Sequence, residues 1–149
     1  MSFADLLRPE AVLIGPDAAD KWQLLRRLAE ALVACGALPA ERLEEAVAAL
    51  EARERSVSTG MEQGIAVPHA ALEDLERVLA ALAVVPDGIE FQSLDGQPAR
   101  IVVLLLVPRR EKVLHVKTLT EVARRLGDED FRRRILACRS GEEVVALWS

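Results

Sequence analysis

The chain has 149 residues, of which 51% are hydrophobic and 29% charged, which is enough apolar material for one folded domain and excludes a disordered tail. Its formal net charge of −5 argues against a wholly basic nucleic-acid binder, and its longest apolar run, Ile101–Val107, is far shorter than the ~20 residues of a membrane-spanning helix. Without a basic and then apolar N-terminal segment, and with only two cysteines, the sequence predicts a single cytoplasmic domain over residues 1–149, with no membrane insertion.

The first part of the sequence predicts a strand and two helices. A short apolar run at 11–14 predicts the strand. Asp17 is the predicted N-cap of a helix that ends at Gly36, because apolar side chains recur at three- and four-residue spacing between them. Pro39 suits the first position of the second helix. From Arg53 to Gly64 no apolar periodicity remains, so this stretch is predicted as a loop.

The centre of the sequence predicts the strands of a sheet. Apolar runs of strand length lie at 65–67 and 78–85, and the segment 89–91 alternates between apolar and polar residues. Asp95-Gly96 is a hairpin-type turn signal. It leads into Ile101–Val107, whose uninterrupted Val, Leu and Ile residues predict a central strand covered on both faces.

Helices dominate the last third of the sequence. The pattern predicts one helix over 111–126, another over 128–139, and a third that begins at Ser140 with a capping box closed by Glu143. Long helices are thus available to cover both faces of a sheet. The sequence therefore predicts an α/β fold in three layers and leaves the strand order open.

Charge is distributed unevenly along the chain. The first 107 residues carry nine basic and 17 acidic side chains, whereas the last 42 carry ten basic and seven acidic ones. The basic residues between Arg109 and Arg139 are interleaved with acidic and apolar residues at helical spacing. We interpret them as a solvated helix face, with a docking patch as the alternative. With no Tyr, three Phe and two Trp, the chain offers no stacking platform for single-stranded nucleic acid.

Two histidines, His69 and His115, are the side chains that titrate near neutrality by default. His69 follows Pro68, which blocks strand pairing and so presents the next side chain at a strand end. His115 shares a helix face with apolar residues, as a buried core histidine would, but its helix leaves the C-terminal end of the 101–107 strand. If the strand before His69 is parallel to that strand, both imidazoles lie at one sheet edge, where α/β proteins place ligand sites.

This pair of imidazoles favours phosphoryl transfer over acyl transfer. A neutral imidazole is a good nucleophile at pH 7, and the phosphoramidate that it forms is labile enough to be passed on. The Ser58 and Thr59 hydroxyls, loop amides, and the guanidinium of Arg53 or Arg55 are within reach to stabilise the phosphoryl oxygens. The sequence has no Gly-x-Ser-x-Gly elbow and no P-loop. A metal site has no support either, because no third ligand lies at suitable spacing.

Two segments resemble the signature of IIA components of the sugar phosphotransferase system, in the fructose/mannitol branch that includes the nitrogen-regulatory IIA proteins. They are Arg53–Gly60 (RERSVSTG) and Gly64–Ala70 (GIAVPHA), and the resemblance extends over nearly the whole chain. It implies an α/β sandwich with a mixed parallel and antiparallel sheet. It also implies that a histidine phosphocarrier protein phosphorylates His69, without a metal or a soluble cofactor.

The same resemblance implies roles for further residues. His115 would be a second active-site histidine that hydrogen-bonds the phosphoryl group or its acceptor. Arg53 would help to neutralise the phosphate, although Arg55 lies close enough in sequence to be the alternative. The residues implied to shape the pocket beside His69 are Ser58, Thr59, Gly60 and Pro68.

Three functions remain open from the sequence. A domain that stands alone, without a membrane part or a fused sugar-transfer domain, favours a nitrogen-regulatory protein in which phosphorylation switches binding to a target protein. The alternative is a fructose/mannitol-type IIA component that passes phosphate to a IIB domain and so feeds a sugar permease. The third is a non-catalytic α/β binding domain with inert histidines. The sugar, the target and the oligomeric state are not encoded in any pattern that we recognise.

Overall fold

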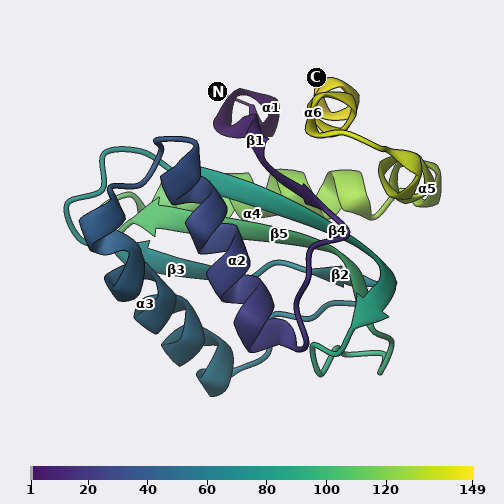
Figure 1. Cartoon of the computed structure of the whole chain (residues 1–149), viewed down its shortest axis with the longest axis horizontal. Helices are drawn as coiled ribbons and strands as arrows, with labels where there is room; N and C mark the ends of the chain where they lie inside the picture. Colours follow the sequence, from purple (N-terminus) through teal and green to yellow (C-terminus); the bar gives the residue numbers. More distant parts are fainter. Residues whose placement is uncertain (1) are drawn as a thin grey trace.

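The structure is a computed structural model that describes residues 2–149, apart from the side chains of Lys112 and Leu114. A five-stranded mixed sheet lies between two layers of helices (Figure 1), which confirms the predicted three-layer α/β fold. The strands are β1 (Leu7–Ile14), β2 (Ile65–Ala66), β3 (His69–Leu72), β4 (Leu79–Ile89) and β5 (Ala99–Pro108). The helices are α1 (Phe3–Leu6), α2 (Lys21–Ala34), α3 (Leu43–Ser56), α4 (Lys112–Leu126), α5 (Glu129–Ala137) and α6 (Gly141–Trp148), with a 3₁₀ turn at Ala40–Arg42.

The sheet is organised around β5. This strand pairs antiparallel with β4 along one edge, and along the other edge it pairs in parallel with β2 and then with β3. Strand β1 pairs in parallel with the far side of β4. Pro9 lies within β1, which is tolerated because β1 is an edge strand whose register with β4 shifts between Leu7 and Val12.

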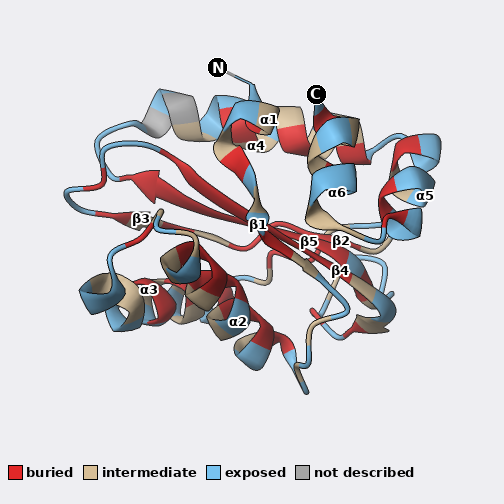
Figure 2. Cartoon of the chain, turned by 45° about the horizontal axis from the view of Figure 1, so that its top comes forward, coloured by how far each residue is buried: buried red, intermediate tan, exposed pale blue. Residues whose placement is uncertain are grey.

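The predicted central strand has two buried faces. Val102, Leu104 and Leu106 pack in the core beneath α2 and α3, whereas the alternate residues of β5 pack beneath α4, α5 and α6. The two-residue repeat of a strand thus divides its side chains between two hydrophobic cores. Figure 2 shows these buried strands between the helical layers, with α2 and α3 on one side and α1, α4, α5 and α6 on the other.

Two helix boundaries differ from the prediction. Helix α2 is capped by Asp20, whose carboxylate accepts a hydrogen bond from the amide of Gln23 at 2.9 Å, and not by Asp17. An N-cap side chain accepts from an amide two or three residues further along, and the chain becomes helical only at Lys21, so Asp17 lies too far upstream. Pro39 precedes the 3₁₀ turn that leads into α3, rather than starting α3 itself.

Helix α3 also extends further than predicted. It continues to Ser56, so Arg53 and Arg55 lie on its last turn and the loop begins at Val57. The apolar periodicity ended early because Glu54 occupies the next buried position of the helix, where it is 3% exposed. A buried charged residue thus concealed the last turn of the helix.

The chain around Pro68 does not end a strand as predicted. Pro68 separates β2 from β3, and pairing with β5 resumes at His69, which lies opposite Leu105. The carbonyl of Pro68 still accepts a hydrogen bond from the amide of Leu105 at 3.0 Å, so only its missing donor interrupts the ladder. The parallel pairing beside the 101–107 strand, which the sequence analysis required as a condition, is present in the structure.

Many of the basic residues near the C-terminus are used within the fold. Arg125 donates to the last carbonyls of α6 and Arg132 to the last residue of α4, where the helix dipole favours positive charge. Arg133 and Arg134 both pair with Asp130. These contacts support the interpretation as a solvated helix face. Among the described residues, no helix is long and apolar enough to cross a membrane.

The predicted cap of α6 is present in part. The hydroxyl of Ser140 accepts a hydrogen bond from the amide of Glu143, as in a capping box. The carboxylate of Glu143 accepts from the amide of Arg139, one residue before the predicted position.

Candidate functional site

The two histidines meet at one end of the sheet. His69 is the first residue of β3, and His115 lies in the first turns of α4, which follows β5. Their ring centroids are 5.1 Å apart and the ring planes are inclined by 62°. The fold therefore brings together the two imidazoles that the sequence singled out.

The ring of His69 is held in one tautomer by the backbone. Its Nδ1 atom lies 2.8 Å from the carbonyl oxygen of Val67. Because a carbonyl oxygen only accepts hydrogen bonds, Nδ1 must carry the proton, and the lone pair resides on Nε2. The pKa of His69 is lowered chiefly by burial and also by the charge of Arg53, against an opposing effect of the Val67 hydrogen bond. His69 is therefore neutral and nucleophilic at Nε2 near pH 7.

The ring of His115 is partly buried beside it. Its pKa is lowered by burial first, then by the proximity of His69 and by the charge of Arg53. Within the described part of the chain, its buried Nε2 atom has no hydrogen-bond partner. A buried polar atom without a partner is uncommon, and this one belongs to a ring that contacts the ring of His69.

A cleft of about 410 Å³ opens beside His69. It lies where the end of α3 and the loop that follows meet the loop between β4 and β5 and the middle of α4. Its described lining residues are Arg53, Val57, Ser58, Thr59, Gly60, Met61, Val67, His69, Leu94, Leu119 and Ala123. This lining is mainly apolar, and the guanidinium of Arg53 is the group in it that can pair with an anion.

Arg53, and not Arg55, is the arginine of the cleft. Its guanidinium donates to the carbonyl of Val57 at 2.8 Å, and its charge lowers the pKa of both histidines. The guanidinium of Arg55 lies instead over the ring of Trp22, 5.1 Å from the ring centroid. Of the two candidates, the structure places Arg53 beside His69.

The loop residues of the predicted pocket line the cleft, with their polar groups engaged internally. The Ser58 hydroxyl donates to the carbonyl of Phe91 and accepts from the amide of Gly60 at 3.0 Å. The Thr59 hydroxyl donates to the carboxylate of Glu54. Gly60 packs closely on Ser93, so that an added Cβ would lie 2.5 Å from the Ser93 hydroxyl. These groups fix the shape of the cleft wall.

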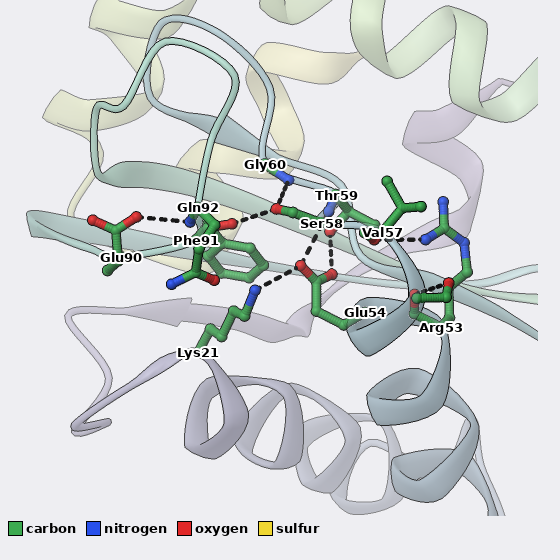
Figure 3. A network of polar contacts seen from close by, with 11 residues as sticks. Lys21, Arg53, Glu54, Val57, Ser58, Thr59, Gly60, Glu90, Phe91 and Gln92 are labelled. Carbon is green, nitrogen blue, oxygen red and sulfur yellow. Dashed lines mark hydrogen bonds and ion pairs between the residues drawn. The ribbon is translucent and has the colours of Figure 1, made fainter.

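Lys21 and Glu54 form a buried ion pair behind this wall, which the sequence analysis did not identify. Figure 3 shows the Lys21 Nζ, the Thr59 amide and the Thr59 hydroxyl converging on the Glu54 carboxylate. One signal was available, because Val47, Leu50 and Glu54 follow the three- and four-residue spacing of the buried face of α3. Among the described residues, no group of three or more His, Cys, Asp or Glu side chains is arranged to hold a metal ion.

Residues 5–149 match the family model described as phosphoenolpyruvate-dependent sugar phosphotransferase system, EIIA 2. The chain belongs to this family. It is 32% identical to a nitrogen regulatory protein of Bradyrhizobium diazoefficiens over 147 residues, which is 99% of this chain and 94% of the relative. The chain is therefore a phosphotransferase-system IIA protein with nitrogen-regulatory relatives.

Solved structures of family members have the same fold. The nitrogen regulatory protein IIA-Ntr from Neisseria meningitidis superimposes with a TM-score of 0.89 at 24% identity, covering 99% of both chains. The complex of enzyme IIAMTL with phosphorylated enzyme IIBMTL from Escherichia coli gives a TM-score of 0.77 at 26% identity, covering 96% of this chain and 98% of the other.

Proposed function

We propose that this protein is a phosphoryl carrier that accepts phosphate on Nε2 of His69 from a phosphorylated histidine carrier protein. The observation that carries the proposal is the hydrogen bond from His69 Nδ1 to the Val67 carbonyl, which leaves the Nε2 lone pair on a ring that lines the cleft. The protein would act in the cytoplasm, the compartment that the sequence predicts.

The transfer step balances without a metal or a separate base. The lone pair of His69 Nε2 attacks the phosphorus of the donor's phosphohistidine, and a new P–N bond forms. The P–N bond of the donor breaks, and its electron pair returns to the donor imidazole, which leaves as a neutral ring because its other nitrogen carries a proton. The proton on His69 Nδ1 stays in place, and the Val67 carbonyl stabilises the positive charge that the phosphorylated ring acquires.

Arg53 and His115 supply the charge stabilisation in this proposal. The guanidinium of Arg53 is the cation whose field reaches both imidazoles, so it also acts on the phosphoryl oxygens. His115 Nε2, buried without a partner among the described residues, donates to a phosphoryl oxygen when it carries the proton. Ser58, Thr59, Gly60 and Pro68 act through the shape of the cleft.

Exposed apolar residues around the histidines support docking of another protein. Val57 and Leu94 line the cleft, and Val113 and Val116 flank His115 on α4. All four side chains are between 62% and 80% exposed. In the structurally similar mannitol complex, the IIA enzyme binds a phosphorylated IIB enzyme. We infer that donor and acceptor proteins dock here, and that the acceptor is a regulatory target, as the nitrogen-regulatory relatives suggest.

The test is acid-labile labelling by a phosphorylated histidine carrier protein. The wild-type chain is expected to take up label, His69→Ala to take up none, and His115→Ala to take it up but pass it on slowly. Pull-downs with His69→Ala and His69→Asp then test the regulatory output, since a phosphorylation-sensitive partner distinguishes the two. Stable labelling of His69→Ala would refute the proposal.

A further inference from the structure

Lys21 and Glu54 form an ion pair that is buried between α2 and α3. The Lys21 Nζ lies 3.0 Å from Glu54 Oε2, and the two side chains are 7% and 1% exposed. Lys21 is the first residue of α2 and Glu54 lies on the last turn of α3, so the ion pair joins the start of α2 to the end of α3. Burying two charges is costly, and a pair of apolar residues would serve helix packing at least as well.

The Glu54 carboxylate fixes the wall of the cleft. Its Oε2 accepts from the Thr59 amide at 3.0 Å, and its Oε1 accepts from the Thr59 hydroxyl. From the other side, the Ser58 hydroxyl is bonded to the Phe91 carbonyl. The guanidinium of Arg53, the residue before Glu54, donates to the carbonyl of Val57 at 2.8 Å, so the loop wall is tied both to Glu54 and to Arg53 (Figure 3).

The charge of Glu54 creates a problem that Lys21 solves. The carboxylate acts on the imidazole of His69, where it opposes the effect of Arg53 on the pKa. The same negative charge would repel a phosphoryl group on His69, and the repulsion is stronger at a partly buried ring than in bulk water. The ammonium of Lys21, in direct contact with the carboxylate, offsets part of this charge and leaves the two bonds to Thr59 intact.

We propose that Lys21 and Glu54 are positioning residues for phosphoryl transfer, in which Glu54 holds the Thr59 turn and Lys21 neutralises Glu54 toward the phosphoryl group. This inference rests on the proposed function of His69. It predicts that the Glu54 carboxylate slows phosphoryl transfer once Lys21 is replaced by a neutral residue. A purely structural ion pair predicts instead that Lys21→Met loses stability, that the double variant regains it, and that kcat of the folded protein does not change in either.

The experiment compares Lys21→Met with the double variant Lys21→Met/Glu54→Gln. The matched control is Arg26→Met/Glu44→Gln, because that pair also joins α2 to α3 but is exposed. Transfer from a phosphorylated histidine carrier protein is measured as separate kcat and KM values. Hydrogen exchange of the Thr59 amide reports the position of the loop, and near-ultraviolet circular dichroism reports the fold.

Lys21→Met is expected to lower kcat by ~10²-fold with KM little changed, since the unpaired Glu54 carboxylate then repels the phosphoryl group during transfer while the docking surface is intact. The double variant is expected to recover at least tenfold of that loss, and the control to keep the wild-type rate. Thr59→Val keeps the ion pair and removes one bond to Glu54, so it is expected to lower kcat by about tenfold even if Lys21→Met does not fold. Thr59→Ser, which keeps the hydroxyl, should recover most of this loss.

Two results would overturn the inference while leaving His69 as the phosphorylated residue. These are a Lys21→Met variant that transfers at the wild-type rate, and a folded double variant slower than Lys21→Met. Should Lys21→Met not fold, wild-type transfer by Thr59→Val would overturn it in the same way. Failure of the wild-type chain to be labelled on His69 would refute the proposed function, and the inference with it.

Discussion

Replacing Gly60 by alanine should displace the wall of the phosphoryl cleft. The backbone of Gly60 lies outside the left-handed region, so the effect of the new methyl group is steric. An added Cβ would lie 2.5 Å from the Ser93 hydroxyl, 2.9 Å from Ser93 Cα and 3.0 Å from the Phe91 carbonyl oxygen. Ordinary carbon contacts are ~3.5–4.0 Å, so the two loops must separate by about 1 Å.

This displacement has two measurable consequences. Overpacking of this kind costs about 1–3 kcal/mol in the free energy of unfolding, which chemical denaturation measures. A shift of about 1 Å at the cleft lowers the rate of phosphate acceptance on His69 by ~10²-fold, which the labelling assay measures.

Gly36→Ala is the matched control. Gly36 follows α2 with a φ of +81° and has open space around its Cβ position, so alanine there costs about 1–2 kcal/mol through the backbone alone. The control should thus lose comparable stability and retain the transfer rate. Wild-type transfer by Gly60→Ala, or an equal loss in Gly36→Ala, would refute the reasoning.

The remaining predictions concern charge and pH. Arg53→Leu should raise the pKa of both His69 and His115 in an NMR titration, because the guanidinium lowers both, whereas Arg55→Leu should leave them unchanged; equal effects of the two substitutions would contradict the assignment of Arg53 to the cleft. Folding lowers the pKa of both histidines, so below the unfolded value of ~6.5 the unfolded chain binds more protons than the folded one. The free energy of unfolding therefore decreases as the pH is lowered below that value. Denaturation at pH 7 and pH 5 should show a smaller loss for His69→Ala/His115→Ala than for the wild type, and an equal loss would show that neither histidine contributes.

The sequence predicted the centre of the fold because its signals there are local. An unbroken apolar run between a turn signal and a proline is typical of a strand buried on both faces, and β5 is such a strand. The meeting of His69 and His115 followed from one further condition, the parallel pairing of β3 with β5. Given that pairing, the rule that α/β proteins place ligand sites at one sheet edge predicts that the two imidazoles lie together.

The parts that the sequence did not predict depend on contacts between distant segments. Four residues are too few to show helical periodicity, and α1 is stabilised by a tilted contact of the Phe3 ring with Trp148, with 4.4 Å between ring centroids. Asp17 and Asp20 are equivalent as caps by composition, and only the path of the chain selects Asp20.

The details of the site were hidden for the same reason. Glu54 seemed to belong to a polar loop because its partner, Lys21, is 33 residues away in the sequence. The tautomer of His69 depends on the direction of a single backbone carbonyl, that of Val67, which no residue pattern specifies.

Direct observation of the His69 ring nitrogens by ¹⁵N and ³¹P NMR, before and after incubation with a phosphorylated histidine carrier protein, tests the central claim most directly. Before phosphorylation, we expect the proton on Nδ1 and an unprotonated Nε2; afterwards, we expect phosphorus bonded to Nε2. Phosphorus on Nδ1, or on any residue other than His69, would contradict it.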